Sequence, residues 1–245
     1  MSSDSRGSLY LLPNLLGESA PEAVIPAEVL SRARSLDYLI AENPKAARAF
    51  LKRIGATRTL RSIRIERLDH NTPPAELAPL LDPLLAGRDA GLLSEAGLPA
   101  VADPGAGLIR LAHRRGLRVV PLSGPSSILL ALSASGLEGQ RFAFNGYLPV
   151  PPAEFVAALK ELERRSQRLR QTQIFMETPY RNDRSLALAL RTLEPDTQVC
   201  VAADLTLQSE TVQTQSVAAW RRAPPRLKGR PAIFLLLAAA GLSAC

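Results

Sequence analysis

The sequence contains little of the chemistry that metal and thiol enzymes use. It has two cysteines and two histidines in 245 residues. The two cysteines are Cys200, which lies in an apolar run, and Cys245. Two cysteines are too few for a disulfide framework or a zinc site. We therefore expect no metal ion in the protein. Low cysteine use is also typical of a reducing compartment, so we expect a cytoplasmic protein.

Several sequence features that signal a particular function are also missing. The longest apolar run, from Ala232 to Leu242, is too short to span a bilayer, and no charged-then-apolar signal segment opens the chain. We therefore expect no membrane association. There is no Gly-Lys-Ser phosphate-binding run, and Gly17 stands alone where a dinucleotide fold has three spaced glycines. Nucleoside triphosphate and dinucleotide chemistry are thus poorly supported.

What the sequence does have is apolar residues and arginine. Hydrophobic residues make up 46% of the chain, which is ample for buried cores. The formal net charge is +7 and the isoelectric point is near 10. Because arginine pairs with phosphates in a bidentate way, this excess favours a nucleic-acid partner. A solvated helix surface rich in arginine would give the same excess, so charge alone leaves both interpretations open.

Apolar runs typical of strands recur in the first half of the chain, and segments with helical periodicity follow them. The predicted strands are Leu9–Pro13, Tyr38–Ala41, Ile63–Leu68, Gly91–Leu93 and Leu117–Leu122, and helices include Pro44–Ile54 and Gly105–Arg115. This alternation predicts a mainly parallel sheet with helices on both faces. Ligands of such sheets bind beyond the carboxyl ends of the strands.

The second half has a different pattern. A helix is expected over Ser126–Ser135 and another over Ala153–Arg168, with strands at Phe142–Tyr147, Gln173–Met176, Gln198–Ala203, Glu210–Gln215 and Ala232–Ala238. The strands between residues 198 and 215 are too close together for an intervening helix, so this half should contain antiparallel pairs. We predict two α/β domains, residues 1–122 with a mainly parallel sheet and residues 123–245 with a mixed sheet.

Three loops contribute backbone more than reactive side chains. They are SEAGLP and ADPG, both within residues 94–105, and LSGPSS at residues 122–127. Glycine and proline let the main chain approach a ligand closely. Such loops suit a ligand with an adenine edge, ribose hydroxyls and an amino-acid end, as S-adenosylmethionine has. Transfer of its activated methyl group requires alignment and a base, not His or Cys.

Together these segments resemble the tetrapyrrole methylase family. The resemblance rests on SEAGLPAVADPG, GLRVVPLSGPSSILLALSASGL and FAFNGYLP, and extends to LYLLPNLLGE, DYLIAEN, DHN, IFMETPYR, AADLTLQSET and KGRPAIFLL, in the family's order. It is nearest to the branch that methylates a ribose 2′-hydroxyl of small-subunit ribosomal RNA. The resemblance implies two α/β domains, S-adenosylmethionine in the cleft between them, an RNA substrate and a homodimer.

The resemblance also implies which residues hold the cofactor. They are Pro13, Ser94, Glu95, Ala96, Gly97, Val101, Asp103, Ser126 and Ser127, with Tyr180, Leu205, Pro231 and Ala232 from the second domain closing over the adenine. Many of these contacts should be made by the main chain. For Asp103, a cap on the helix that starts at Gly105 is an equally good interpretation.

The chain departs from the branch's pattern at charged positions. Ala-Glu-Asn-Pro-Lys at residues 41–45 replaces Ala-Glu-Asp-Thr-Arg, and Glu95 and Leu98 replace Asp and Thr. Ala-Asp-Leu-Thr at residues 203–206 lacks the usual Arg and the Lys that follows, and Arg230 replaces a Glu. Since the cofactor-side glycines and prolines persist, we infer a working methyltransferase scaffold whose substrate need not be the branch's usual one.

Acidic residues at predicted strand ends are the candidate catalytic groups. Glu42, Glu95 and Glu177 could each orient or deprotonate a hydroxyl, although Glu177 and Arg181 could instead form a salt bridge at a helix start. Candidate substrate-binding residues are Lys45, His70, Asn71 and Arg181, where His70 could equally belong to a turn. Methylation of a ribosomal RNA ribose is the leading function. Methylation of a small tetrapyrrole-like molecule and non-catalytic cofactor or RNA binding are the alternatives.

Overall fold

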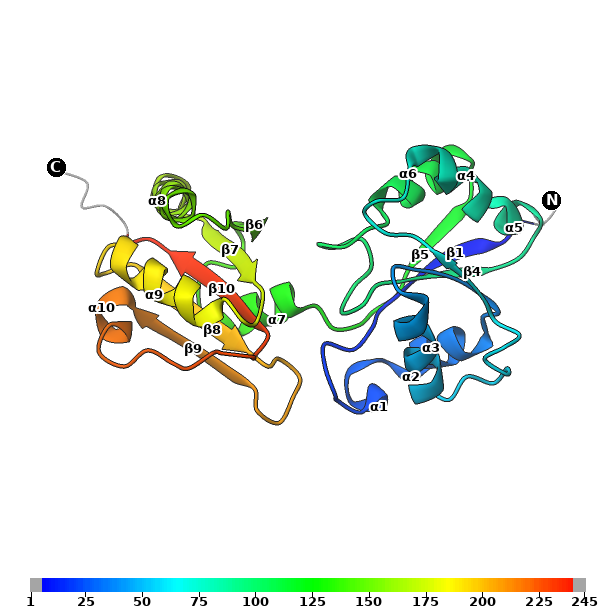
Figure 1. Cartoon of the computed structure of the whole chain (residues 1–245), viewed down its shortest axis with the longest axis horizontal. Coiled ribbons are helices and arrows are strands. Elements are labelled where there is room, and N and C mark those ends of the chain that lie inside the picture. The colour runs from blue at the N-terminus through cyan, green and yellow to red at the C-terminus, as the bar shows by residue number, and fades with distance from the viewer. Residues whose placement is uncertain (1–5, 240–245) are drawn as a thin grey trace. The chain divides into compact units, whose positions relative to one another are not determined.

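The computed structural model describes residues 6–239, so Cys245 lies outside the described residues. The chain forms two compact units, one ending at Ser126 and the other beginning at Ser127, each built around its own sheet (Figure 1). The boundary predicted between residues 122 and 123 lies within the segment that follows the last strand of the first unit. None of the helices within residues 6–239 combines the length and apolar character needed to cross a membrane.

The N-terminal unit contains a five-stranded sheet in which every strand pair is parallel. The strands are β1 (Ser8–Leu12), β2 (Tyr38–Ala41), β3 (Arg64–Arg67), β4 (Ala90–Leu93) and β5 (Arg118–Pro121), in the spatial order β3-β2-β4-β1-β5. All five strands were predicted, with ends that differ by at most two residues. The prediction of a mainly parallel sheet is therefore confirmed.

Helices cover both faces of this sheet because its central strands are apolar throughout. Every residue of β2 and β4 is buried, as expected for parallel strands enclosed by helices. One face packs against α2 (Ala27–Ser35) and α3 (Pro44–Arg53), and the other against α4 (Leu77–Leu80), α5 (Asp82–Leu85) and α6 (Ala106–Arg114). The short α1 (Pro21–Val24) and the 3-10 helix η1 (Pro74–Glu76) lie in connecting segments.

The C-terminal unit contains a mixed sheet, as predicted. Its strands are β6 (Phe142–Tyr147), β7 (Thr172–Glu177), β8 (Gln198–Ala203), β9 (Thr211–Ser216) and β10 (Ala232–Leu237), in the order β6-β7-β10-β8-β9. β6 and β7 are parallel, whereas β10 runs antiparallel to both β7 and β8, and β9 runs antiparallel to β8. The carboxyl ends of β7 and β8 thus lie at the same edge as the start of β10.

Alternate residues of the C-terminal strands face two different helix layers. α8 (Pro152–Leu169), α9 (Asn182–Thr192) and α10 (Val217–Trp220) cover a core that includes the stacked rings of Phe175 and Phe234. The Trp220 indole is buried there and donates a hydrogen bond to the Val199 carbonyl at 2.8 Å. α7 (Ser127–Ser135) packs against β8, β9 and β10 and contributes buried Ile128 to the packing.

Candidate active site

The connections of the N-terminal sheet create a crevice between β2 and β4. The chain leaves β2 toward the edge strand β3, whereas it leaves β4 in the other direction, past β1, to β5. Ligands of open parallel sheets bind beyond the carboxyl ends of two strands whose connections part in this way. Glu42 directly follows β2, and Ser94 and Glu95 directly follow β4. Two of the predicted catalytic carboxylates therefore lie at the opening of this crevice.

Asn14, just beyond β1, holds the loop that follows β4. Its side-chain amide donates to the carbonyls of Ser94 at 2.9 Å and Glu95 at 3.0 Å. Its backbone exchanges two hydrogen bonds with Gly97, of 2.8 and 3.2 Å, and its Oδ1 accepts one from the Leu15 N–H. Asn14 is buried and was not predicted from the sequence, where its one signal is a polar residue directly after a strand. This side chain fixes the path of the loop.

The loop after β4 has an unusual backbone that only some residues tolerate. Gly97 has φ +66°, and a Cβ there would lie 3.3 Å from the Leu16 side chain and 3.5 Å from the Pro125 carbonyl. Ala100 and Ala102 also have positive φ, 62° and 64°. For a residue with a Cβ this conformation costs of order 1 kcal/mol or more. Such strain concentrates at functional sites, so this loop is a strong candidate for one.

A hollow of about 530 Å³ opens beside these carboxylates. It is lined by Glu42, Asn43, Pro44, Arg67, Asp69, His70, Asn71 and Glu95. A second hollow of about 270 Å³ includes Asn14, Ala96 and Phe50 in its lining and shares Glu95 with the first. The structure thus brings together two predicted catalytic residues and the predicted substrate residues His70 and Asn71. Lys45, an exposed residue in the first turn of α3, does not line either hollow.

The electrostatics of this edge raise the pKa of two of its acids. Burial raises the pKa of Glu42, and the negative charges of Asp103 and Glu95 raise it further, against the opposing influence of His70. Burial and the charge of Glu95 also raise the pKa of Asp103, although the hydrogen bond with Ser94 opposes this. Among the described ion pairs, none includes Glu42, Glu95 or Asp103. A carboxylate with a raised pKa is a stronger base than an ordinary one.

Asn43 links the crevice to helix α3. Its Oδ1 accepts hydrogen bonds from the N–H groups of Lys45 at 3.0 Å and Ala46 at 3.3 Å, so it caps the helix. Its Nδ2 donates to Oε1 of Glu95 at 3.1 Å. The cap could be predicted from Asn followed by Pro at a helix start. The contact with Glu95 could not, because the two residues are 52 positions apart.

The loop after β3 is a turn that Asp69 closes. The Asp69 carboxylate accepts hydrogen bonds from the Asn71 N–H at 2.9 Å and the Thr72 hydroxyl at 3.2 Å, and pairs with Arg67 at 2.7 Å. Desolvation alone would raise the pKa of Asp69, but these partners together lower it. The turn leaves His70 and Asn71 exposed at the hollow. His70 thus belongs to a turn and also lies within reach of a ligand there.

Asp103 does not cap the following helix. α6 begins at Ala106, and its N-cap residue Gly105 makes no side-chain cap. The capping interpretation of Asp103 is therefore wrong, because the carboxylate turns to the Ser94 hydroxyl instead. Nearby, Pro13 packs so closely on Gly124 that a Cβ at Gly124 would lie 2.1 Å from the proline ring. The segments after β1, β4 and β5 are thus packed together at the same edge.

The C-terminal unit has its own polar edge, where β7 and β8 end and β10 begins. Of the predicted residues, Glu177, Tyr180, Arg181, Leu205, Pro231 and Ala232 lie at this edge, and Ser127 opens α7. The Glu177 side chain is fully buried and both its oxygens accept from Arg181, at 2.8 and 2.5 Å. The salt-bridge interpretation of this pair is confirmed. Both carboxylate oxygens of Glu177 are therefore occupied.

Three buried polar atoms at this same edge have no hydrogen-bond partner. They are Thr178 Oγ1, Asn182 Oδ1 and Thr206 Oγ1, in the segments that follow β7 and β8. Asn182 is fully buried, and its amide donates to the Arg230 carbonyl at 2.6 Å while its oxygen stays unpaired. Because a buried unpaired polar atom is costly, these atoms fit an edge that a polar ligand completes.

Comparison with known proteins places the chain in a family. The family model described as Tetrapyrrole (Corrin/Porphyrin) Methylases matches residues 23–219. The chain belongs to the tetrapyrrole methylase family. It is a methyltransferase by this membership. Within residues 6–239, no group of three or more His, Cys, Asp or Glu is placed to hold a metal ion.

Relatives of this methylase have both sequence and fold in common with it. A protein of Escherichia coli O157:H7 named ribosomal RNA small subunit methyltransferase I is 34% identical, covering 85% of this chain and 69% of the relative. A protein of the same name from Mesorhizobium japonicum is 33% identical, covering 86% and 68%. The crystal structure of the methyltransferase CobJ matches with a TM-score of 0.62 at 17% identity over 95% of both chains. That likeness shows the fold.

Two departures of this methylase from the pattern of its ribosomal RNA branch are contacts in the structure. Asn43 and Glu95, which replace two aspartates, are joined by the 3.1 Å hydrogen bond described above. Arg230, which replaces a glutamate, pairs with Asp204 at 2.7 Å and also donates to the Ser209 carbonyl. The replaced residues thus make polar contacts, an amide contact for Glu95 and an ion pair for Arg230.

Proposed function

We propose that this methylase transfers a methyl group from S-adenosylmethionine to a ribose 2′-hydroxyl of small-subunit ribosomal RNA. The observation that carries the proposal is the cluster of Glu42, Glu95 and Asp103 without cationic partners, beside a hollow of about 530 Å³. The names of the curated relatives support the RNA substrate. We also propose that the protein acts in the cytoplasm and as a homodimer, in keeping with the family resemblance.

The chain offers suitable partners for S-adenosylmethionine in each unit. When bound, the cofactor supplies a methyl group already activated on a sulfonium. In the N-terminal unit, Ser94, Asp103 and the backbone of residues 95–97 present hydrogen-bonding groups on a loop that Asn14 holds. In the C-terminal unit, the unpaired oxygens of Thr178, Asn182 and Thr206 lie near the apolar Leu205 and Ala232. Each set by itself presents groups that suit the hydroxyl, amine or adenine groups of such a ligand.

Glu42 is the best candidate for the base that accepts the hydroxyl proton. It is half-buried, its pKa is raised and its carboxylate lines the hollow. The bound cofactor would supply the methyl carbon and would leave as a neutral thioether when its carbon–sulfur bond breaks, while the Glu42 carboxylate would accept the proton that the ribose hydroxyl loses. Glu95, held by Asn43, keeps negative charge next to Glu42 and so maintains its basicity. Glu177 is unsuited to this role because Arg181 binds both its oxygens.

Cationic and amide groups around the hollow can position the RNA. Arg67, His70 and Asn71 line it, and Lys45 is exposed on the adjoining helix α3. Each can contact phosphate or ribose oxygens of the nucleotide next to the methylated one. Arg181, in contrast, is engaged by Glu177 and is better described as a structural residue.

The direct test is a transfer assay with labelled S-adenosylmethionine. Purified protein is incubated separately with small ribosomal subunits, with free small-subunit RNA and with a small-molecule extract, and labelled RNA is digested to nucleosides. We expect label in a 2′-O-methylnucleoside from one of the RNA samples. Label in the extract alone would favour a tetrapyrrole-like substrate, and cofactor binding with label in none of the three would show a non-catalytic relative.

A further inference from the structure

The amino edge of the N-terminal sheet, opposite the candidate active site, carries many arginines. Because the strands are parallel, their first residues all lie at this edge, together with the last turns of the helices that precede them. Those last turns contain Arg32 and Arg34 in α2, Lys52 and Arg53 in α3, and Arg114 in α6. We call this surface the basic edge. Its further members are Arg6, Arg58, Arg61, Arg64, Arg88, Arg115 and Arg118.

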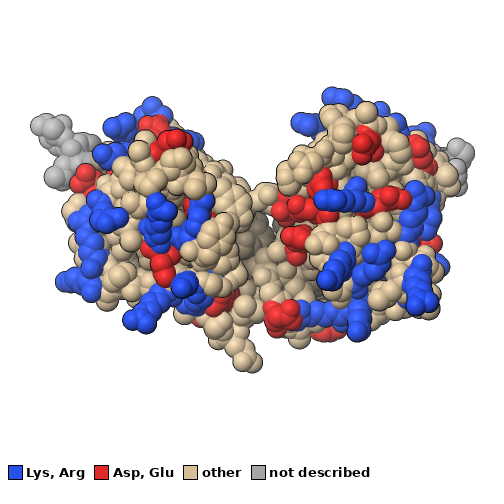
Figure 2. Space-filling view, in the orientation of Figure 1, with Lys and Arg blue, Asp and Glu red and all other residues tan. Residues whose placement is uncertain are grey.

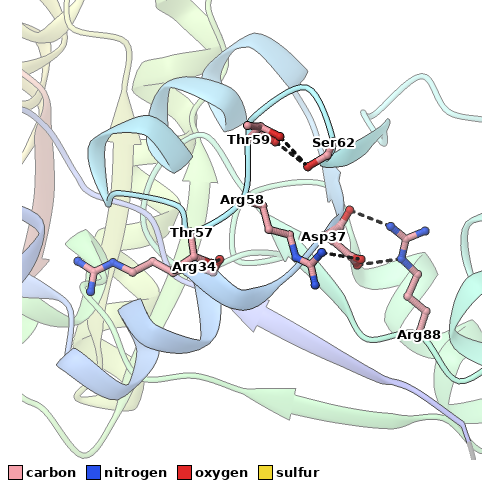
Figure 3. A network of polar contacts seen from close by, with 7 residues as sticks. All are labelled: Arg34, Asp37, Thr57, Arg58, Thr59, Ser62 and Arg88. Carbon is pink, nitrogen blue, oxygen red and sulfur yellow. Dashed lines mark hydrogen bonds and ion pairs between the residues drawn. The ribbon is translucent and has the colours of Figure 1, made fainter.

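Several of these arginines are held in a connected network. Asp37 binds Arg88 at 2.9 Å and Arg58 at 3.9 Å, and Figure 3 shows both guanidinium groups turned toward this one carboxylate. The guanidinium groups of Arg64 and Arg88 lie 5.2 and 5.5 Å from the ring centre of Tyr38. These three arginines of the basic edge thus have fixed positions, which reduces the entropy that they lose on binding.

The acids of the basic edge are too few to neutralise it. Asp37 serves both Arg58 and Arg88, and Asp89 pairs with Arg32 at 3.6 Å. The remaining described pairs join Arg34 to Glu22, Arg53 to Glu18, Arg64 to Glu66 and Arg115 to Asp82, so six acids face the twelve basic residues of this edge. Arg61, Arg114 and Arg118 are exposed, and none of them takes part in an ion pair described for residues 6–239. In Figure 2, blue side chains spread over the right and lower parts of the right-hand unit, while red ones gather on its left side.

The attraction of cations to helix ends explains only part of this pattern. Positive side chains in a last turn stabilise the helix dipole, which accounts for Arg32, Arg34 and Arg114. Arg61 lies in the loop before β3, and Arg118 is the first residue of β5, so neither has a helix end to stabilise. These two residues flank the sheet on its opposite edge strands. Their charge requires a different explanation.

We propose that the basic edge binds the phosphate backbone of folded RNA outside the methylated nucleotide. This inference rests on the proposed function, since it names a second contact for the same substrate. Guanidinium groups match phosphate geometry, and a surface with excess positive charge attracts RNA by releasing its counterions. The strands between the two edges contain four or five residues, which places the edges about 15 Å apart. A mononucleotide or dinucleotide at the active site is too short to reach the basic edge, whereas a folded RNA spans both.

The test uses the full chain with three arginines changed together, R61Q/R114Q/R118Q. None of these side chains has a described hydrogen bond or ion pair, so folding and cofactor binding should not change. The matched control is R168Q/R184Q/R191Q in the C-terminal unit, which removes the same charge from three exposed arginines, two of them also in last turns. Binding to a folded small-subunit RNA transcript is measured over a range of salt concentrations, and compared with binding to dinucleotide fragments of the same RNA.

We expect the first variant to raise the Kd for folded RNA by about tenfold or more and to reduce the salt dependence by about one phosphate contact per arginine. The control should bind like the wild type, and fragments should bind all three proteins equally. Equal weakening in both variants would overturn the proposal in favour of net charge, and no weakening would overturn it outright. A third outcome also contradicts the proposal. If the first variant binds RNA as the wild type does but loses the affinity that the wild type has for phosphatidylglycerol vesicles, the basic edge binds a lipid surface instead.

The two proposals fail in different ways. If the wild type transfers no methyl group to RNA but the first variant still loses affinity for the folded transcript, the proposed function is wrong and the basic edge stands. If the wild type methylates RNA and the first variant binds and methylates it equally well, the proposed function stands and the basic edge is wrong.

Discussion

The strand edges at the candidate sites of the two units hold their acidic residues in opposite ways. At the edge of the N-terminal unit, burial and then the charges of Asp103 and Glu95 raise the pKa of Glu42, and none of the three acids takes part in a described ion pair. In the C-terminal unit, Glu177 and Asp204 are each bound by an arginine, at 2.5 and 2.7 Å. An unpartnered carboxylate can accept a proton or a ligand, whereas a paired one stabilises the fold. The comparison predicts that the first group serves catalysis and the second serves structure.

The largest effect should come from Glu42→Gln, which removes the proposed base. We expect the rate of methyl transfer to fall by about 10²–10⁴. The variant should be at least as stable as the wild type at pH 7. The folded-state pKa of Glu42 is raised, so its contribution to stability is present at low pH and lost as the pH rises through that pKa. Thermal unfolding and single-turnover kinetics check both results, and a lower Tm with an unchanged rate would reverse the assignment.

A loss of stability is expected instead from Glu177→Gln. The change leaves the Arg181 guanidinium, whose side chain is 19% exposed, without its partner, and should cost about 3 kcal/mol. Denaturant unfolding measures this cost. The double variant E177L/R181M removes both charges and should recover much of the stability while keeping activity per folded molecule. A stable E177Q protein that has lost activity would instead give Glu177 a chemical role.

Asn14→Ala should have an intermediate effect on both properties. It leaves the buried carbonyl of Ser94 and the part-buried carbonyl of Glu95 without their donor, which we expect to cost about 2 kcal/mol. The loosened loop should also weaken cofactor binding, measured by calorimetry with S-adenosylmethionine. Asn71→Ala is the control, since no side-chain hydrogen bond of Asn71 is described and stability should change little. Equal unfolding free energies for the two variants would show that Asn14 does not hold the loop.

The smallest effect concerns pH. The base must be ionised, so activity should fall as the pH drops through the raised pKa of Glu42. Asn43→Asp keeps the helix cap but puts another negative charge beside Glu95, which should move this acid limb to higher pH. Asn43→Ser keeps a cap without adding charge and serves as the control. If the pH–rate profile of the aspartate variant is the same as that of the wild type, the acid that controls the rate is not Glu42 beside these charges, and the assignment of the base is wrong.

The sequence predicted most of the fold because its strands are short apolar runs with clear boundaries. Tyr38–Ala41, Phe142–Tyr147 and Gln198–Ala203 were predicted with the same ends that the structure shows. The close spacing of the strands predicted at Gln198–Ala203 and Glu210–Gln215 likewise indicated antiparallel pairing and a mixed sheet. What the sequence predicts less well is short helices such as α1 and α10, which are four residues long and depend on tertiary packing more than on periodicity.

The candidate site was predicted in its parts but not in its contacts. Carboxylates after predicted strands could be identified because parallel strands end at one edge. The Glu177–Arg181 pair could be predicted as well, since the residues are four positions apart at a helix start. The contacts of Asn14 with the loop after β4 and of Asp204 with Arg230 join residues far apart in the chain, with no local pattern to reveal them. These contacts decide which acids are free and which are paired.

The central claim is that the unpaired acids of the N-terminal unit carry the chemistry and the paired acids of the C-terminal unit do not. Single-turnover methyl transfer to small-subunit RNA, compared between wild type, E42Q and E177L/R181M at saturating S-adenosylmethionine, tests it most directly. The account predicts a rate at least about 100-fold lower for E42Q and within about tenfold of wild type for the double variant. A normal rate in E42Q, or a comparable loss in a folded E177L/R181M protein, would contradict it.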